Sequence, residues 1–231
     1  MLVKLKRSLL RWNYHLSSKS RQLKFDLFWS LIKPVAGMSV LNLGATTPHI
    51  GQVLADAGDS LVEQPEQDVR WGLLKVVGCN ILFSNMQDYR LRYSKVGFCA
   101  VVADGCKLPF ADKSFDIVFS NAVIEHLTPE GQRLMANEIA RVGRSWFVTT
   151  PNFWYPIELH NKLPFFQFLP QSAQKLVQRK LKTWPEDEPI NLLTSRGLLK
   201  LLPGSKVIRL RVTFYPETLI AFQVENKQNL S

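Results

Sequence analysis

The sequence predicts a doubly wound α/β fold built on a mostly parallel, seven-stranded sheet. Short runs that are apolar at nearly every position are typical of parallel strands buried on both faces. Helix signals lie between these runs, so strands and helices alternate along the chain, as in doubly wound folds. The seven runs cover residues 38–43, 80–83, 98–103, 115–119, 146–150, 207–214 and 218–224.

Two of the predicted helices have recognisable beginnings. Thr128-Pro129-Glu130 offers a capping side chain, a first-turn proline and an acidic residue near the positive end of the helix dipole. Thr194 or Ser195 similarly precedes a leucine-rich segment. The last two apolar runs are joined by only a short connection at residues 215–217. We therefore expect them to form an antiparallel C-terminal hairpin on the otherwise parallel sheet.

Length and composition indicate one compact domain with a basic extension. The 231 residues are 46% hydrophobic and 11% aromatic, which excludes general disorder. The net charge is +10, and residues 1–33 hold eight Lys or Arg against the single acidic Asp26. We predict a basic helical N-terminal extension over residues 1–33 and a main domain over residues 34–231. The charge suits a solvated surface first, and contact with an anionic membrane, an acidic glycan carrier or nucleic acid second.

The chain is expected to be cytoplasmic, in peripheral contact with a membrane at most. Charges interrupt the N-terminal segment where a signal peptide needs a continuous apolar core, and no apolar run reaches the ~18 residues of a membrane span. Leu2, Leu5, Leu9, Leu10 and Trp12 interleave with those charges, which suits an amphipathic helix lying on the domain or on a membrane. The three cysteines lack metal-ligand spacing and are interpreted as reduced thiols, with Cys99 packed in the core.

Residues 152–189 do not follow the strand and helix rhythm. They are rich in proline and aromatic residues and come directly after the apolar run at 146–150. In open α/β sheets, ligands bind outside the carboxyl ends of the strands. This insert is therefore a candidate lid or substrate wall, or an extra packing layer.

The most informative stretch is residues 100–127. An apolar run ends at Asp104, Leu108 and Phe110 follow, and a second run ends at Ser120-Asn121. An acidic side chain at a strand end could accept a hydrogen bond from an adenine edge, and the two apolar side chains could flank the ring. Asp104 alone would equally suit a turn.

The same stretch resembles a known family. It contains, in order, Asp-Gly-x-x-Leu-Pro-Phe, Ser-Phe-Asp-Ile-Val-Phe-Ser-Asn and Val-Ile-Glu-His. This order resembles the class I S-adenosylmethionine-dependent methyltransferases of the type 11 group, and residues 141–170 resemble the same group. The resemblance implies a Rossmann-like methyltransferase fold with S-adenosylmethionine as its cofactor. The implied cofactor-binding residues are Asn42, Gly44, Ser84, Asp104, Gly105, Cys106, Leu108 and Asn121.

The glycine loop after the first strand departs from the family pattern. That pattern is Asp-x-Gly-x-Gly-x-Gly, whereas this chain has Asn42-Leu-Gly44-Ala-Thr46-Thr-Pro48 and keeps only the first glycine. Glycines matter there because a side chain would collide with the methionine part of the cofactor. We therefore expect Thr46 and Pro48 to alter cofactor geometry. Asn42 still accepts a hydrogen bond, but it lacks the carboxylate charge.

The residue that binds the ribose hydroxyls is not fixed by the sequence. Counting back from Asp104 places the second strand at residues 80–83 and the ribose position at Ser84 or Asn85, neither of which is acidic. Counting forward from Gly44 points instead to Glu63. The first alignment is favoured.

Glu125-His126 follows the fourth strand, near the expected place of the methyl group. His126 could act as a general base on a hydroxyl acceptor, or it could bond a neighbouring helix. Relatives that resemble quinone O-methyltransferases bind a divalent metal through Glu-x-x-Glu-His. Because this chain has Ala122 in place of the first Glu, no metal is predicted.

Three residues of the insert are candidates for the acceptor pocket. By resemblance, Glu158 and His160 lie over the acceptor, and His160 is a second candidate base. Trp154 is expected to bind substrate as part of the aromatic wall. The alternative is that Glu158 and His160 tie the insert to the domain.

The predicted function is S-adenosylmethionine-dependent methyl transfer to a small-molecule, lipid-linked or glycan acceptor. The alternative is a non-catalytic binding protein with the methyltransferase fold and a degenerate cofactor loop. A nucleic-acid partner is disfavoured because the chain lacks the Asn/Asp-Pro-Pro-Tyr/Phe signature and any known RNA-binding module. A nicotinamide dehydrogenase is disfavoured because Thr46 and Pro48 interrupt the loop that would hold a pyrophosphate.

Overall fold

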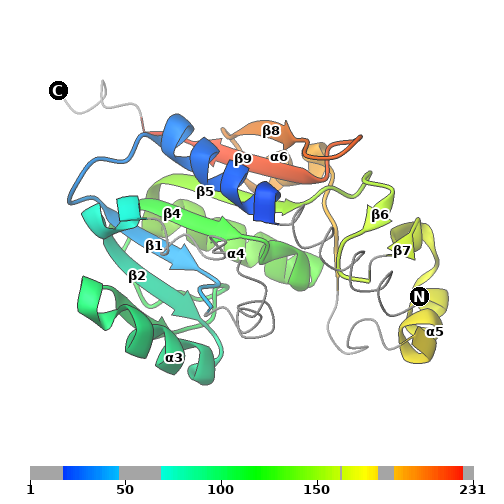
Figure 1. Cartoon of the computed structure of the whole chain (residues 1–231), viewed down its shortest axis with the longest axis horizontal. Coiled ribbons are helices and arrows are strands. Elements are labelled where there is room, and N and C mark those ends of the chain that lie inside the picture. Colours follow the sequence, from blue (N-terminus) through cyan, green and yellow to red (C-terminus); the bar gives the residue numbers. More distant parts are fainter. Residues whose placement is uncertain (1–17, 47–68, 162, 182–189, 226–231) are drawn as a thin grey trace, which may run out of the picture.

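The computed structural model describes residues 18–46, 69–161, 163–181 and 190–225 of the chain (Figure 1). Seven strands form one sheet in the order β3-β2-β1-β4-β5-β9-β8. The strands are β1 (Ser39–Leu43), β2 (Lys75–Asn80), β3 (Cys99–Val102), β4 (Phe115–Asn121), β5 (Gly143–Pro151), β8 (Lys206–Leu210) and β9 (Thr218–Gln223). β1 to β5 pair in parallel, and β9 runs antiparallel to both β5 and β8. The predicted fold class, including the C-terminal hairpin, is confirmed.

Helices cover both faces of the sheet. On one face, the N-terminal helix (residues 18–32) and α3 (Phe83–Tyr93) bury aromatic side chains against alternate positions of the central strands. On the other face lie α4 (Pro129–Val142) and α6 (Ser195–Leu201). Neighbouring residues of β1 show the alternation, because Val40 belongs to the first cluster and Leu41 to the second.

Both predicted helix starts are present. The Oγ1 atom of Thr128 accepts a hydrogen bond from the backbone N–H of Gly131 at 3.2 Å, and Pro129 occupies the first turn of α4. Thr194, rather than Ser195, caps α6 by accepting from the N–H of Gly197 at 3.1 Å. Each cap satisfies one of the backbone donors that a helix start leaves without an intrahelical partner.

The second strand lies earlier in the sequence than predicted. The structure places β2 at Lys75–Asn80, so the run at residues 80–83 is not a strand. It contains the end of β2 and the start of α3, where Ile81, Leu82 and Phe83 are exposed. The prediction that Cys99 packs in the core is also wrong, because β3 is an edge strand and Cys99 is exposed.

The described part of the insert forms a small unit at the carboxyl edge of the parallel strands, on the right of Figure 1. It consists of a two-stranded antiparallel sheet, β6 (Ile157–Glu158) and β7 (Leu163–Pro164), a 3-10 turn η5 (Phe166–Phe168), and α5 (Gln171–Leu181). None of the helices in the described ranges is long and apolar enough to cross a bilayer. The amphipathic segment at residues 2–12, the loop from Thr47 onward and Glu63 lie outside the described residues.

Candidate functional site

The order of the sheet reverses between β1 and β4. From β1 the chain continues outward through β2 and β3, and from β4 it continues through β5 on the other side. At this reversal Leu43 pairs with Ser120, so Gly44 and Asn121 follow side by side. We call this place, where β1 and β4 lie side by side, the switch point of the sheet. A reversal of this kind in a parallel sheet opens a crevice at the carboxyl ends of the strands, which is the usual ligand site of the architecture.

Gly44 is required by this geometry. Its φ of +83° lies in the left-handed region, and a Cβ atom there would collide with Cγ2 of Val123. A larger residue would therefore be strained in its backbone and would collide with the segment after β4. The N–H groups of Gly44 and Ala45 both donate to the carbonyl of Cys79, at 2.8 and 3.1 Å, which ties the loop to β2. Asn42, two residues earlier, is buried within β1.

Asn80 stands at the carboxyl end of β2, where the ribose-binding position was sought. Its Nδ2 donates to the carbonyl of Ala45 at 2.9 Å, and its Oδ1 accepts from the N–H of Leu82 at 2.9 Å. Ser84 lies further on, in the first turn of α3, and is exposed. The offset follows from the earlier end of β2. Sequence reasoning missed Asn80 because the apolar run was taken to continue through Phe83.

Asp104 shapes the turn after β3. One of its carboxylate oxygens accepts from the N–H of Cys106 at 2.8 Å, and the side chain is exposed at the strand end. The half-buried Gly105 lies in the same turn, with Leu43 in ordinary contact distance of a Cβ placed on it. The thiol of Cys106 lies 3.4 Å from the carbonyl of Gly131. The turn-forming role foreseen for Asp104 is therefore present.

The loop that follows Asp104 is fastened to α4 by an ion pair. Glu138 accepts from the N–H of Leu108 at 2.6 Å and from the guanidinium of Arg141. Arg141 also donates to the carbonyls of Leu108 and Phe110 and to Asp112. Leu108 itself is only 5% exposed and packs in the core, so its side chain holds the loop down.

A buried lysine reaches the switch point from the N-terminal helix. Nζ of Lys24 donates to Oδ1 of Asn121 at 2.9 Å, and the same oxygen accepts from the hydroxyl of Thr149 at 2.8 Å. Burial, together with the like charge of Arg21, lowers the pKa of Lys24 to about 8, whereas Glu125 and Glu217 act in the opposite direction. Nothing in the sequence pattern singled out Lys24 among the many cations of residues 1–33.

Two histidines meet beyond the carboxyl end of β4. His126 ends a 3-10 turn, η4 (Ile124–His126), and its ring contacts the ring of His160 edge to face, with the centroids 4.9 Å apart. His160 comes from the insert, 34 residues further along by number, so only the fold brings the two together. Burial and the neighbouring His160 lower the pKa of His126 to about 4, which keeps its ring neutral at physiological pH.

Glu158 fixes the orientation of His160. Its Oε1 lies 2.8 Å from Nδ1 of His160 and accepts from the N–H of the same residue at 3.0 Å. Its Oε2 accepts from the N–H and Nδ2 of Asn161 at 2.6 and 2.8 Å. Burial alone would raise the pKa of Glu158, but these hydrogen bonds outweigh it and lower the pKa below its usual range.

Glu125 is fully buried beside the histidines. One carboxylate oxygen accepts from the hydroxyl of Thr150 at 3.1 Å, while Oε1 has no hydrogen-bond partner among the described residues. Burial raises the pKa of Glu125 to about 7. Glu125, His126 and His160 offer ligand atoms that all lie within 4.8 Å of one another, so these three side chains could together hold a metal ion. The sequence predicted no metal because Ala122 replaces the first Glu of the family's metal-binding motif. In the structure His160 offers a third ligand atom beside Glu125 and His126 instead.

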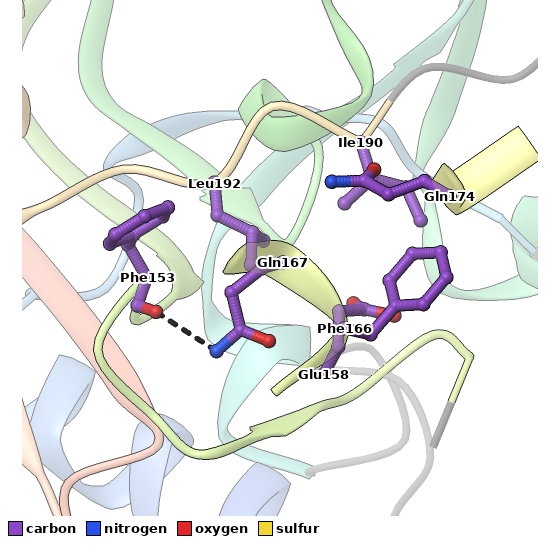
Figure 2. A pocket seen from close by; sticks show the side chains of 7 residues that line it. All are labelled: Phe153, Glu158, Phe166, Gln167, Gln174, Ile190 and Leu192. Carbon is purple, nitrogen blue, oxygen red and sulfur yellow. Dashed lines mark hydrogen bonds between the residues drawn. The ribbon is translucent and has the colours of Figure 1, made fainter. Parts of the chain in front are cut away.

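A small pocket separates the insert from the segment that follows it (Figure 2). It encloses about 290 Å³, part of which is open to solvent. Glu158 contributes to its wall, and Gln167 donates to the carbonyl of Phe153 at 3.1 Å across it. The other lining residues are Phe166, Gln174, Ile190 and Leu192. Trp154 does not line this pocket; its side chain is exposed and lies against Phe153 and Phe168.

Part of this chain matches a family model, and its fold matches solved structures. Residues 59–145 match the family model of the type 11 methyltransferase domain, so the predicted resemblance is confirmed. The match begins after the altered loop at Gly44. Comparison with curated protein sequences gives no significant match.

Solved structures share the fold at low sequence identity. The PH0226 protein from Pyrococcus horikoshii OT3 is 17% identical, with 88% of this chain and 89% of that chain covered and a TM-score of 0.54. A SAM-dependent methyltransferase from Methanosarcina mazei is 14% identical, with 84% and 95% covered and a TM-score of 0.54. A protein from Rhodobacter sphaeroides described as a putative Zn-dependent alcohol dehydrogenase is 12% identical, with 88% and 89% covered and a TM-score of 0.57. The family and the fold support methyl transfer in general, and the acceptor must be argued from the site.

Proposed function

We propose that the chain transfers the methyl group of S-adenosylmethionine to a hydroxyl oxygen of a small-molecule, lipid-linked or glycan acceptor. The observation that carries this proposal is the pair formed by Glu158 and His160 beyond the carboxyl edge of the sheet. A carboxylate that accepts a hydrogen bond from Nδ1 of a histidine sets the tautomer in which Nε2 is the basic nitrogen, as a general base requires. A base of this kind is needed when the methyl acceptor is a hydroxyl group.

The residues around the switch point fit the cofactor. Gly44 allows the left-handed turn that ends β1 at the switch point, because it carries no side chain and adopts a positive φ. Asp104 presents a carboxylate at the end of β3, and Asn80 presents an amide at the end of β2. We assign the ribose hydroxyls to Asn80 in place of Ser84, and the adenine edge to Asp104. Gly105, Cys106 and Asn121 complete the proposed wall, with Asn42 and Leu108 supporting it from within the core.

In the proposed mechanism, the protein aligns the acceptor and removes a proton. The cofactor supplies an electrophilic methyl group when it is bound. His160 accepts the proton of the acceptor hydroxyl, and Glu158 stabilises the resulting imidazolium through Nδ1. His126, neutral at physiological pH, packs against the ring of His160 and limits its motion. Holding the nucleophile in line in a partly dehydrated site supplies much of the acceleration.

The proposal is tested first by binding. Calorimetry with S-adenosylmethionine and S-adenosylhomocysteine should show both ligands binding at micromolar concentrations. Absence of binding by either ligand at high micromolar concentration would refute the proposal. Binding without methyl transfer to any acceptor pool would instead favour the non-catalytic binding protein.

Methyl transfer is tested with labelled cofactor and cell extracts split into aqueous and organic-soluble pools. Label in the organic pool identifies a lipid-linked acceptor, and label in the aqueous pool a small molecule or free glycan. His160→Ala should remove the labelling and leave S-adenosylhomocysteine binding intact. Glu130→Gln, on the exposed face of α4, serves as the control that changes neither.

The surface of the insert supports peripheral contact with an anionic membrane. Solvent-exposed aromatic side chains cluster there, and Trp154 and Phe165 both lie against Phe168. α5, which follows, contains Lys175, Arg179 and Lys180 and no acidic residue. Exposed aromatic groups beside cations suit the interface of an anionic bilayer.

Vesicle sedimentation tests this contact. The protein should sediment with vesicles that contain phosphatidylglycerol more than with phosphatidylcholine alone. The double change Trp154→Ser and Phe168→Ser should reduce sedimentation, whereas Phe214→Ser, at an exposed site between β8 and β9, should not. Equal sedimentation of both variants would remove the insert from the proposal.

A further inference from the structure

Lys24 is unusual among the cations of this chain because its charge is buried. The residue lies on the N-terminal helix (residues 18–32), and only 8% of it is exposed. Its ammonium group ends at the switch point, where it donates to Oδ1 of Asn121 at 2.9 Å. Removing an ammonium from water is costly unless its charge and its donors are matched.

The described residues do not match that charge. An ammonium has three donors, and among the described residues Asn121 is the hydrogen-bond partner of Lys24. Oδ1 of Asn121 is also shared with Thr149. None of the ion pairs in the described ranges includes Lys24.

The surrounding charges do not provide a contact partner either. The charged groups that act on Lys24 are Arg21, of the same sign, and Glu125 and Glu217, of the opposite sign. If Lys24 served only to attach the helix to β4, an uncharged donor at this position would do so without the cost of burying a charge. A buried cation whose donors are not all matched by the described residues indicates an anionic ligand.

We propose that Lys24 binds the carboxylate of the methionine part of S-adenosylmethionine. The inference rests on the proposed function and adds a residue to its cofactor site. Asn121 directly follows Ser120, which pairs with Leu43, and Gly44 follows Leu43. Lys24 is therefore bonded to the strand end that adjoins the glycine turn, rather than to the histidine pair where the acceptor is expected. The cofactor has a single carboxylate, and a charge-assisted hydrogen bond to it would satisfy a second donor of the ammonium.

Two ligands that differ in this carboxylate test the proposal. S-adenosylhomocysteine carries the amino acid part, whereas 5′-methylthioadenosine keeps the nucleoside and the thioether without it. For Lys24→Met, calorimetry should give a dissociation constant for S-adenosylhomocysteine that is roughly 10- to 100-fold higher than for the unchanged protein. The dissociation constant for 5′-methylthioadenosine should change less than about twofold, because this ligand has no carboxylate for Lys24 to bind.

The controls separate the possible outcomes. Lys19→Met, at an exposed position of the same helix, should leave both constants unchanged. Lys24→Arg, which keeps the charge, should recover part of the affinity for S-adenosylhomocysteine. Retained binding of 5′-methylthioadenosine by Lys24→Met would also show that the variant is folded.

Three results would overturn the assignment. Equal weakening of both ligands would mean that Lys24 only supports the fold of the site. Unchanged binding of both ligands with a raised KM for the acceptor would place an acidic acceptor, and not the cofactor, at Lys24. If the unchanged protein binds neither ligand, the proposed function fails, and the assignment of Lys24 fails with it.

Discussion

Oε1 of Glu158 lies 2.8 Å from Nδ1 of His160, and both residues belong to the same short segment of the insert. The carboxylate is 1% exposed and is held by Asn161 on its other oxygen, so it cannot turn away without losing several hydrogen bonds. A buried carboxylate fixed in this way sets the tautomer and the direction of the histidine ring. The insert therefore brings to the sheet a histidine that is already oriented.

Glu158→Gln should lower kcat at least about tenfold, because general base catalysis contributes roughly 10²- to 10⁴-fold and depends on the orientation of the base. The amide cannot stabilise the imidazolium as the carboxylate does. The dissociation constant for S-adenosylhomocysteine should stay within about twofold, since Glu158 lies away from the switch point. Steady-state kinetics and calorimetry on the same preparation check both expectations. A full rate at all pH values in the variant would contradict the role of the pair.

Lys24→Met should stabilise the protein without ligand while it weakens cofactor binding. Burial lowers the pKa of Lys24 from 10.5 to about 8, so the folded state binds fewer protons than the unfolded state between these values. The free energy of unfolding of the unchanged protein should therefore rise as the pH increases through this window, by at most roughly 3 kcal/mol at about 1.4 kcal/mol per pKa unit. Urea unfolding at about pH 7 and pH 9.5 should show this gain in the unchanged protein and not in the variant. A variant that is less stable at neutral pH would indicate a structural role.

Glu125→Gln should show the opposite dependence on pH. Burial raises the pKa of Glu125 from 4.5 to about 7, so the folded state keeps a proton that the unfolded state has lost. The unchanged protein should lose stability as the pH rises from about 4.5 to about 7, by at most roughly 3 kcal/mol. The variant should not share this loss. Urea unfolding at pH 5 and pH 8 measures the difference, and parallel curves for the two proteins would show that Glu125 is not penalised by burial.

Arg141→Met should loosen the loop between Asp104 and Phe115. The guanidinium connects Glu138 to the carbonyls of Leu108 and Phe110, so its loss removes several anchors at once. We expect a lower Tm and weaker binding of S-adenosylhomocysteine, because Asp104 begins this loop. Arg133→Met breaks only the exposed pair with Glu130 and should leave both quantities unchanged. Thermal unfolding and calorimetry compare the two variants. Equal effects in both would show that the bonds from Arg141 to the loop do not contribute to cofactor binding.

Removal of divalent metals should leave methyl transfer intact if His160 acts as the base. Glu125, His126 and His160 lie close enough to hold an ion, so the expectation needs a direct test. Activity is measured after treatment with a chelator and again after addition of zinc or manganese. If the chelator abolishes activity and one metal restores it, His126 and His160 are metal ligands, and His160 is not the base.

The sheet and its helices could be predicted because local sequence carries their signals. Buried parallel strands are continuously apolar, and Thr128 and Thr194 both cap helices where the sequence placed them. The predictions that failed concern features that depend on the position of a strand in the sheet. The exposure of Cys99 follows from the edge position of β3, and the end of β2 at Asn80 follows from pairing with β1 and β3.

For the candidate site too, the residue types could be predicted from the sequence, whereas their contacts could not. The family resemblance and the turn residues Gly44 and Asp104 could be read from the sequence. So could four candidate polar groups, those of Glu125, His126, Glu158 and His160. Only the tertiary structure brought His160 against His126 and inserted the ammonium of Lys24 beside Asn121. Those contacts join segments 34 and 97 positions apart. The periodicity of a strand or helix states which face is buried, but it does not state which distant side chain will meet that face.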